Sequence, residues 1–147
     1  MTGQAVLPHW ATPAVQQVAD LHTLAAHSDT DLAHGVRDAL DWVTNPSGPN
    51  PQQVQAEAAG LAPRRREGPY WAGIGDTLAW LVGWQPRPPM DLPRRNPDGT
   101  VPNVAQVVAE MRADAPLAWE PEQAEQAEQT ARRMVARWTA LVDRIDR

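Results

Sequence analysis

The stretches GVRDALDWV, residues 35–43, and GIGDTLAWL, residues 73–81, resemble each other at a spacing of 38 residues. Both carry Gly, Asp, Leu and Trp at matching places, and the rarity of Trp gives the match its weight. A proline-rich segment follows each copy. Self-similarity at a fixed spacing indicates one helical unit used twice. An accidental match in an alanine-rich chain is the alternative interpretation.

The composition indicates a globular all-α protein in which tryptophan supplies most of the large aromatic side chains. The chain has 147 residues, 42% of them apolar, with seven Trp, one Tyr and no Phe. This length predicts one domain with a substantial core, and no segment shows the alternation of a strand. We therefore predict a single helical domain over residues 1–147. It would be a compact bundle of five or six helices, with the two similar stretches at its centre.

Several classes of protein are disfavoured by charge and by residue types that are missing. The net charge of −5 argues against a dedicated nucleic-acid binder, which normally has a strongly basic face. The absence of Cys excludes disulfides, thiolate nucleophiles and cysteine metal sites. The N-terminus has no signal-peptide pattern, and the longest apolar stretch, residues 70–84, is short and contains Asp76. We expect a cytoplasmic protein without a membrane span.

Caps and breakers place the remaining elements. Thr12-Pro13 is a favourable helix start, and the helix should run to about His27, where it either breaks or continues into the first copy. Asn50-Pro51 should begin a short helix, and Gly68-Pro69 the helix of the second copy. The other expected elements are an N-terminal arm at 1–12, a long Pro/Arg-rich loop at 84–102, a helix at 104–114 and a long C-terminal helix at 120–146.

The C-terminal helix has the strictest periodicity in the chain. Its apolar residues recur at alternating steps of three and four, which is the pattern of a coiled-coil seam. The seam is small near the start of the helix and large near its end. This helix should dock across the two similar helices or pair with a second copy, giving a homodimer. The seam residues are Ala124, Ala127, Ala131, Met134, Trp138, Leu141 and Ile145.

A metal site is one hypothesis for the first copy. His27, Asp31, His34 and Asp38 are spaced by four, three and four residues, so they share a face if the helix is continuous. Imidazole and carboxylate groups at one-turn spacing suit a divalent cation. The alternative is an ordinary solvated face, and the site fails if the helix breaks at Ser28. Asp38 and Asp76 could also form a carboxylate pair if both were buried.

Arginines surround the second copy and form the candidate binding surface. Aromatic side chains nearby would let such a surface contact phosphates, stack on bases or bind an acidic protein; solvated loops are the alternative. The candidate binding residues are Arg64, Arg65, Arg66, Trp84, Arg87, Arg94 and Arg95.

No catalytic motif accompanies these features. The sequence lacks a P-loop, a nucleophile elbow, a dinucleotide fingerprint and a zinc-protease motif. We therefore predict no cofactor and a small non-catalytic interaction or regulatory protein. It would act on a protein partner through the Pro/Arg-rich loop and the C-terminal helix. The alternatives are a metal-dependent helical-bundle enzyme using the His/Asp face and a nucleic-acid-associated protein using the arginines. Trp42, Trp80 and Trp138 should belong to the core.

Overall fold

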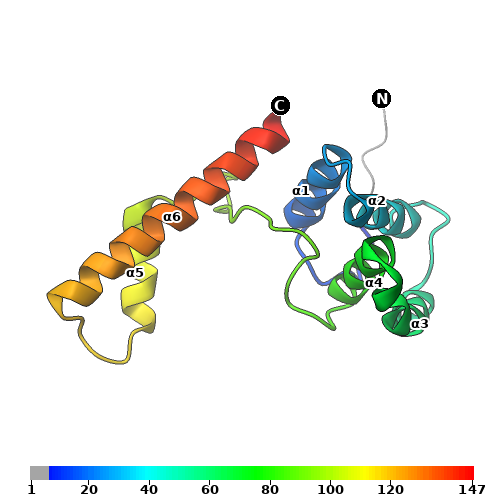
Figure 1. Cartoon of the computed structure of the whole chain (residues 1–147), viewed down its shortest axis with the longest axis horizontal. Helices are drawn as coiled ribbons and strands as arrows, with labels where there is room; N and C mark the ends of the chain where they lie inside the picture. Colours follow the sequence, from blue (N-terminus) through cyan, green and yellow to red (C-terminus); the bar gives the residue numbers. More distant parts are fainter. Residues whose placement is uncertain (1–6) are drawn as a thin grey trace. The chain divides into compact units, whose positions relative to one another are not determined.

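The computed structural model describes residues 7–147, and this part of the chain is helical without any strand (Figure 1). The predicted all-α fold class is confirmed. Within the described residues there are six α-helices and one 3-10 helix. They are α1 (Val15–Ala26), α2 (Asp31–Val43), α3 (Pro51–Leu61), η1 (Ala62–Glu67), α4 (Pro69–Leu81), α5 (Val104–Asp114) and α6 (Pro121–Asp146).

The helices gather into two compact units, and the single domain expected over residues 1–147 stays a prediction. Unit 1 is Met1–Asp91, and unit 2 is Leu92–Arg147. The boundary falls within the predicted Pro/Arg-rich loop, which has no helix between α4 and α5. Prolines remove backbone donors and restrict the preceding residue, so this segment cannot pack as a helix. Each unit is described by itself below.

Unit 1 has an apolar core made by four helices. Helices α1 and α3 contribute to it from either side of the pair formed by α2 and α4, which contact each other most extensively. Each fully buried aliphatic side chain stabilises the fold by about 1.5–3 kcal/mol relative to exposure. The largest fully buried aliphatic side chains of this unit are Leu21, Leu24, Val36, Leu40, Val43, Val54, Leu78 and Leu81.

Helices α2 and α4 cross at the glycines that open the two similar stretches. A Cβ atom on Gly35 would lie 2.2 Å from the carbonyl oxygen of Tyr70, and one on Gly73 would lie 2.4 Å from that of Leu32. Tyr70 follows Leu32 by the same 38 residues that separate the two glycines. The contact is therefore reciprocal, and each glycine admits the backbone of the other helix. Whether the stretches descend from one duplicated unit stays a prediction.

The matching tryptophans differ in their surroundings, and the expected core position of Trp42 is wrong. Trp42 is 39% exposed, whereas Trp80 is 4% exposed. Both project from the same position relative to the buried face of their helices. Helix α4, however, is contacted by α2, α3 and η1, while α2 is contacted by α1 and α4. The neighbours of α4 therefore cover the side of the helix that carries Trp80, whereas the corresponding side of α2, which carries Trp42, is open to solvent.

The N-terminal segment is anchored differently from the expected helix start. Helix α1 begins at Val15, after Ala14 as the N-cap, rather than at Thr12-Pro13. The Thr12 N–H donates to the carbonyl of Leu81 at 2.9 Å, so this residue ties the segment to the end of α4. Leu7, Pro8 and Trp10 of the predicted arm are half-buried. Residues 1–6 of that arm lie outside the described residues.

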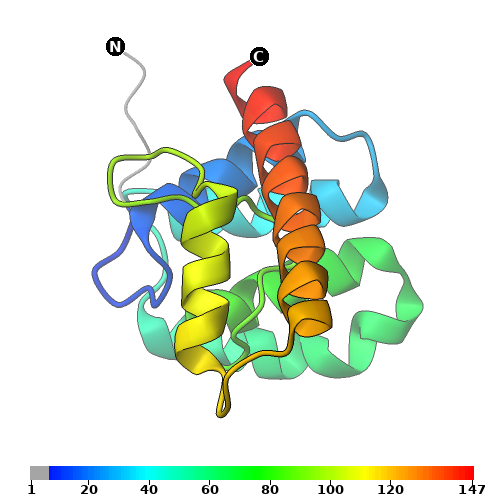
Figure 2. The same ribbon diagram turned by 90° about the vertical axis from the view of Figure 1, so that its left-hand side faces the viewer.

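Unit 2 is a helical hairpin with a thin core. Figure 2 shows α5 and α6 side by side. Val107, Ala131 and Trp138 are its buried hydrophobic residues. The predicted seam of α6 faces inward. Besides the buried Ala131 and Trp138, its other five residues are half-buried, while most of the α6 residues around them are exposed. Helix α5 has 11 residues and α6 has 26, so at 1.5 Å per residue their lengths are about 16 and 39 Å. Helix α6 therefore extends well beyond α5.

No helix within residues 7–147 combines the length and the apolar character needed to cross a bilayer.

Candidate interaction surfaces

The predicted arginine cluster at residues 64–66 lies on η1 and is largely occupied by contacts within unit 1. The Nε atom of Arg64 donates to a carboxylate oxygen of Glu67 at 2.6 Å, and its guanidinium carbon lies 3.5 Å from the centroid of the Trp71 ring. The Arg65 guanidinium lies 3.2 Å from a carboxylate oxygen of Asp76, whose side chain is only 18% exposed. These two arginines hold η1 against α4. Arg66 is exposed and has no ion pair among residues 7–147.

Trp84 and Arg87 also belong to unit 1, where both side chains are exposed. Trp84 is 53% exposed, and its backbone N–H donates to the carbonyl of Ala79 at 2.8 Å just past the end of α4. No stacking of an arginine on Trp84 occurs in the described part of the chain. Trp84 and Arg87 therefore stay a predicted surface without a structural partner for the ring.

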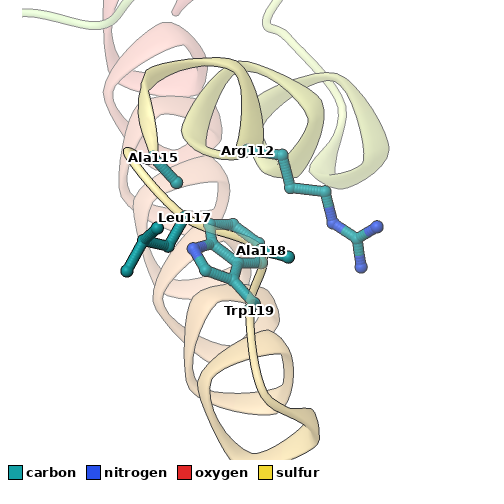
Figure 3. A pocket seen from close by; sticks show the side chains of 5 residues that line it. All are labelled: Arg112, Ala115, Leu117, Ala118 and Trp119. Carbon is teal, nitrogen blue, oxygen red and sulfur yellow. The ribbon is translucent and has the colours of Figure 1, made fainter.

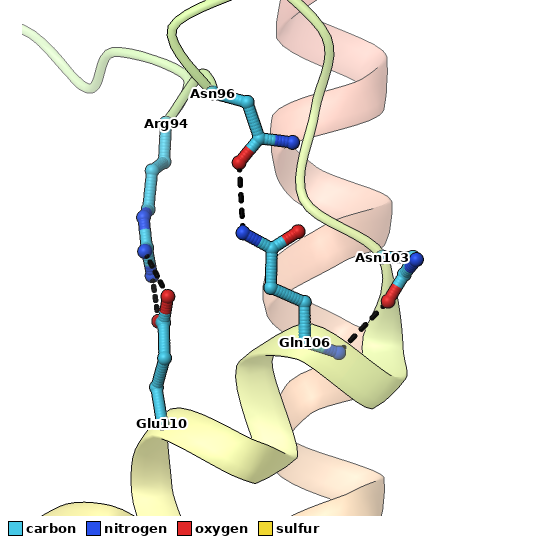
Figure 4. A network of polar contacts seen from close by, with 5 residues as sticks. All are labelled: Arg94, Asn96, Asn103, Gln106 and Glu110. Atoms are coloured by element: carbon cyan, nitrogen blue, oxygen red, sulfur yellow. Dashed lines mark hydrogen bonds and ion pairs between the residues drawn. The ribbon is translucent and has the colours of Figure 1, made fainter.

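Arg94 and Arg95 belong to unit 2, where they hold the loop before α5. Figure 4 shows the forked contact of Arg94 with Glu110, both N–O distances being 2.5 Å. These hydrogen bonds hold the pKa of Glu110 below its usual range and raise the pKa of Arg94. The Arg94 guanidinium also lies 6.0 Å from the Trp138 ring centroid. Arg95 donates to the Gly99 carbonyl at 2.9 Å.

The same loop is fixed by two amide side chains. Gln106 on α5 donates to the side-chain oxygen of Asn96 at 2.8 Å, and Asn103 accepts from the Gln106 N–H at 2.8 Å as the N-cap of α5 (Figure 4). Together with the Arg94 pair, these contacts fasten the segment before α5 onto that helix. The arginines of the predicted binding surface are thus divided between two units, and those of unit 2 support the loop.

The predicted metal ligands are not brought together. The condition for the site was a continuous helix, but α1 ends at Ala26 and α2 begins at Asp31. The Thr30 side chain accepts from the Ala33 N–H at 3.1 Å, which caps α2 and separates His27 from the other three residues. His34 lies 3.2 Å from Asp29 instead. Among residues 7–147, no group of three or more His, Asp or Glu side chains is placed to hold a metal ion.

The aspartates of the two copies have different partners and do not form a carboxylate pair. The Tyr70 hydroxyl donates to Asp38 at 2.5 Å, and this hydrogen bond raises the pKa of Tyr70. Asp76 lies against Arg65. Asp38 is exposed and Asp76 is half-buried. These contacts connect α2 and η1 to α4, so both carboxylates have a structural explanation.

An open groove between α5 and the first half of α6 is a surface that the sequence analysis missed. It encloses about 740 Å³. Its apolar lining is small and aliphatic, and its charged lining has both signs. The apolar residues are Val104, Ala105, Val108, Ala109 and Ala124; the charged ones are Arg112, Glu125, Glu128 and Arg132. The sequence contains one indication of this groove: Ala105 and Ala109 widen the apolar stripe of α5 beyond what one neighbouring helix covers.

A smaller hollow of about 230 Å³ lies at the turn between α5 and α6 (Figure 3). Leu117 in this turn is 80% exposed, the most exposed large apolar residue in the described part of the chain. The guanidinium of Arg112 lies 5.3 Å from the centroid of the Trp119 ring. Arg112 also lines the groove, so the two hollows adjoin on one side of unit 2.

Comparison of the chain with protein-family models, with curated proteins and with solved structures found no match in any of the three.

Proposed function

We propose that this chain is a non-catalytic protein-interaction protein whose α5–α6 hairpin binds a helical segment of a protein partner. The observation that carries the proposal is the groove between α5 and α6, which has a floor of small aliphatic side chains and a charged rim. An amphipathic helix fits such a surface, because its apolar stripe covers the floor while its polar flanks meet the rim. The cytoplasmic location expected from the sequence stays a prediction.

The mixed charge of the rim supports a protein partner over a nucleic acid. The charged lining consists of Arg112 on α5 and of Glu125, Glu128 and Arg132 on α6, and the carboxylate of Glu128 lies 2.6 Å from the guanidinium of Arg132. A phosphate backbone would meet the two carboxylates as well as the arginines. The interaction role of the Pro/Arg-rich loop is revised in this proposal. Arg94 and Arg95 would shape the hairpin that binds, rather than touch the partner.

A single charged substitution in the groove tests this function. Ala109→Glu places a carboxylate over the apolar floor, and Ala136→Glu makes the same change at an exposed position of α6 that does not line the groove. The wild type, A136E and A109E are each used as bait in native cells. One protein should be recovered with the wild type and with A136E but not with A109E. That component must then bind the purified wild-type chain directly in calorimetry, with A109E at least about tenfold weaker.

Circular dichroism on both variants checks that each remains helical. The same set of proteins on all three baits, or a purified component that binds A109E as tightly as the wild type, would contradict a groove-dependent interaction.

A further inference from the structure

We infer that the occupant of the groove is the C-terminal half of α6 from a second copy of this chain, in an antiparallel and reciprocal dimer. The inference rests on the proposed function and names its partner. It begins from a shortage of core in unit 2. A unit of fewer than about 70 residues seldom gains more than a few kcal/mol of stability from its own core. The buried residues of unit 2 are Val107, Ala131 and Trp138 together with Pro93 and Pro102, and the other apolar side chains packed against them are only half-buried.

The apolar surface left partly uncovered lies at two places that complement each other in size. The seam residues in the first half of α6, Ala124 and Ala127, are small, and Ala124 lines the groove together with the alanines of α5. The second half has Leu141, Val142 and Ile145, all half-buried, on the turns that extend beyond α5. Large side chains on one segment and a shallow alanine-lined groove on another are the components of a close-packed helix interface.

An antiparallel arrangement matches these two places twice. If the dyad axis passes level with Met134 along the helix, Ile145 of one copy lies level with Ala124, the groove-lining alanine of the other. Each large end then fills the groove of the other copy, which is the self-complementary contact that a two-fold dimer requires. A parallel arrangement would place alanine on alanine and leave both ends poorly packed.

The charges favour the same direction. Residues 120–132 contain four Glu and one Arg, while residues 133–147 contain four Arg and two Asp. Antiparallel pairing places the acidic half of each α6 beside the basic half of the other, and it also opposes the helix dipoles favourably. Parallel pairing would place like charges together. Size and charge, two independent properties of the same helix, therefore select the same orientation.

Sedimentation analysis of the full chain provides the first test. The wild type should be a dimer, and Ala124→Glu should weaken dimerisation about 100-fold, because it buries an unpaired carboxylate. Ala113→Glu, the same change at an exposed position of α5 that lines neither hollow, should leave the dimer intact. A wild-type monomer at the highest soluble concentration would overturn the inference, as would equal effects of the two variants.

Disulfide trapping tests the orientation, and the absence of native Cys makes it direct. Ala124→Cys mixed with Ile145→Cys should give the mixed disulfide, whereas Ala124→Cys alone should give none, since antiparallel copies place these positions about 30 Å apart. Efficient self-linking of A124C would show a parallel pair and refute the model.

The dimer and the broader function can fail separately. A monomeric wild type together with a different protein lost only from A109E would refute the second copy as occupant and retain the interaction function. A monomer without any groove-dependent partner would refute both.

Discussion

The two units of this chain use similar helices but bury them to different extents. Unit 1 has fifteen buried hydrophobic residues among those described, and unit 2 has three. Helix α4 is contacted by α2, α3 and η1, whereas α6 packs beside α5 within its own unit. A helix with several neighbours can bury more than one face, while a hairpin leaves a face half-covered. The difference indicates that unit 1 is stabilised by its own core, whereas unit 2 leaves apolar surface for a partner to bury.

The largest expected effect comes from removing the central tryptophan of each unit. Trp138→Ala and Trp80→Ala should each cost about 3–5 kcal/mol, because both rings are almost fully buried. The loss should abolish hydrogen-exchange protection throughout α5 and α6 in W138A, while W80A should keep its native helices with weaker protection. Hydrogen exchange with mass spectrometry on the full chain measures both.

Trp42→Ala is the matched control, because Trp42 is exposed at the corresponding place on α2. It should cost less than about 1 kcal/mol. If W42A were as damaging as W80A, the contrast between α2 and α4 would be wrong. A folded unit 2 in W138A would show that its core does not depend on the Trp138 ring.

The glycine crossing gives the next effect and should be confined to unit 1. Gly73→Ala places a Cβ against the Leu32 carbonyl and Gly35→Ala places one against that of Tyr70, and backbone atoms cannot move aside cheaply. We expect each to lower the free energy of unfolding by about 1–3 kcal/mol, measured by urea unfolding.

Gly60→Ala is the control for this prediction. Gly60 lies in α3 with open space around the added atom, so the change should stabilise the helix by about 0.5–1 kcal/mol. Opposite signs for G60A and G73A would confirm that close approach, rather than helix propensity, requires the glycines of the crossing. A stabilised G73A would contradict it.

Removing the equivalent helix N-caps of the two units should give smaller losses of stability and a further comparison of the units. Asn50 caps α3 and Asn103 caps α5, each accepting from the N–H three residues later at 2.8 Å. Asn50→Ala and Asn103→Ala should each cost about 1 kcal/mol locally. Because unit 2 has the thinner core, N103A should increase amide exchange in α5 more than N50A does in α3. The reverse order would argue against marginal stability in unit 2.

The smallest effect concerns the exposed pair of Arg94 with Glu110. The folded pKa of Glu110 lies below its usual value because Arg94 donates to its carboxylate. The pair therefore stabilises unit 2 at pH values above the unfolded pKa of about 4.3, and this contribution is lost as the pH falls through the lower folded pKa. Glu110→Gln lacks the charge and should depend less on pH.

Thermal unfolding of the wild type and E110Q between about pH 7 and pH 3 checks this prediction. The two curves should converge toward low pH, and added salt should reduce their separation at neutral pH. A constant difference across that range would show that Glu110 acts through something other than its charge.

Local sequence rules predicted the helices well where caps and breakers were strong. The starts of α3 and α5 follow from Asn50 and Asn103, whose side chains accept from the backbone of the first turn, and the start of α4 follows from Pro69 at the first helical position after Gly68. The start of α1 was misplaced because Thr12 bonds to the end of α4, a distant segment. Competing caps made the break near Ser28 ambiguous, and the structure selects Thr30.

The candidate surfaces were harder to predict, because the sequence does not show which acidic residue an arginine pairs with. Arg65 meets Asp76, eleven residues away, and Arg94 meets Glu110, sixteen residues away. Both had been expected to contact a ligand. The groove requires two helices to lie beside each other, and α5 alone shows only a broad apolar stripe.

By itself, the sequence determined that this chain is helical, where most helices begin, and which face of α6 is apolar. These properties depend on residues within a few turns of one another, where capping and periodicity act. Only the tertiary structure decided that Trp80 is buried and Trp42 is not, which arginines are paired, and that unit 2 carries an open groove. Those outcomes depend on how many neighbours each helix has, and distant parts of the chain supply those neighbours.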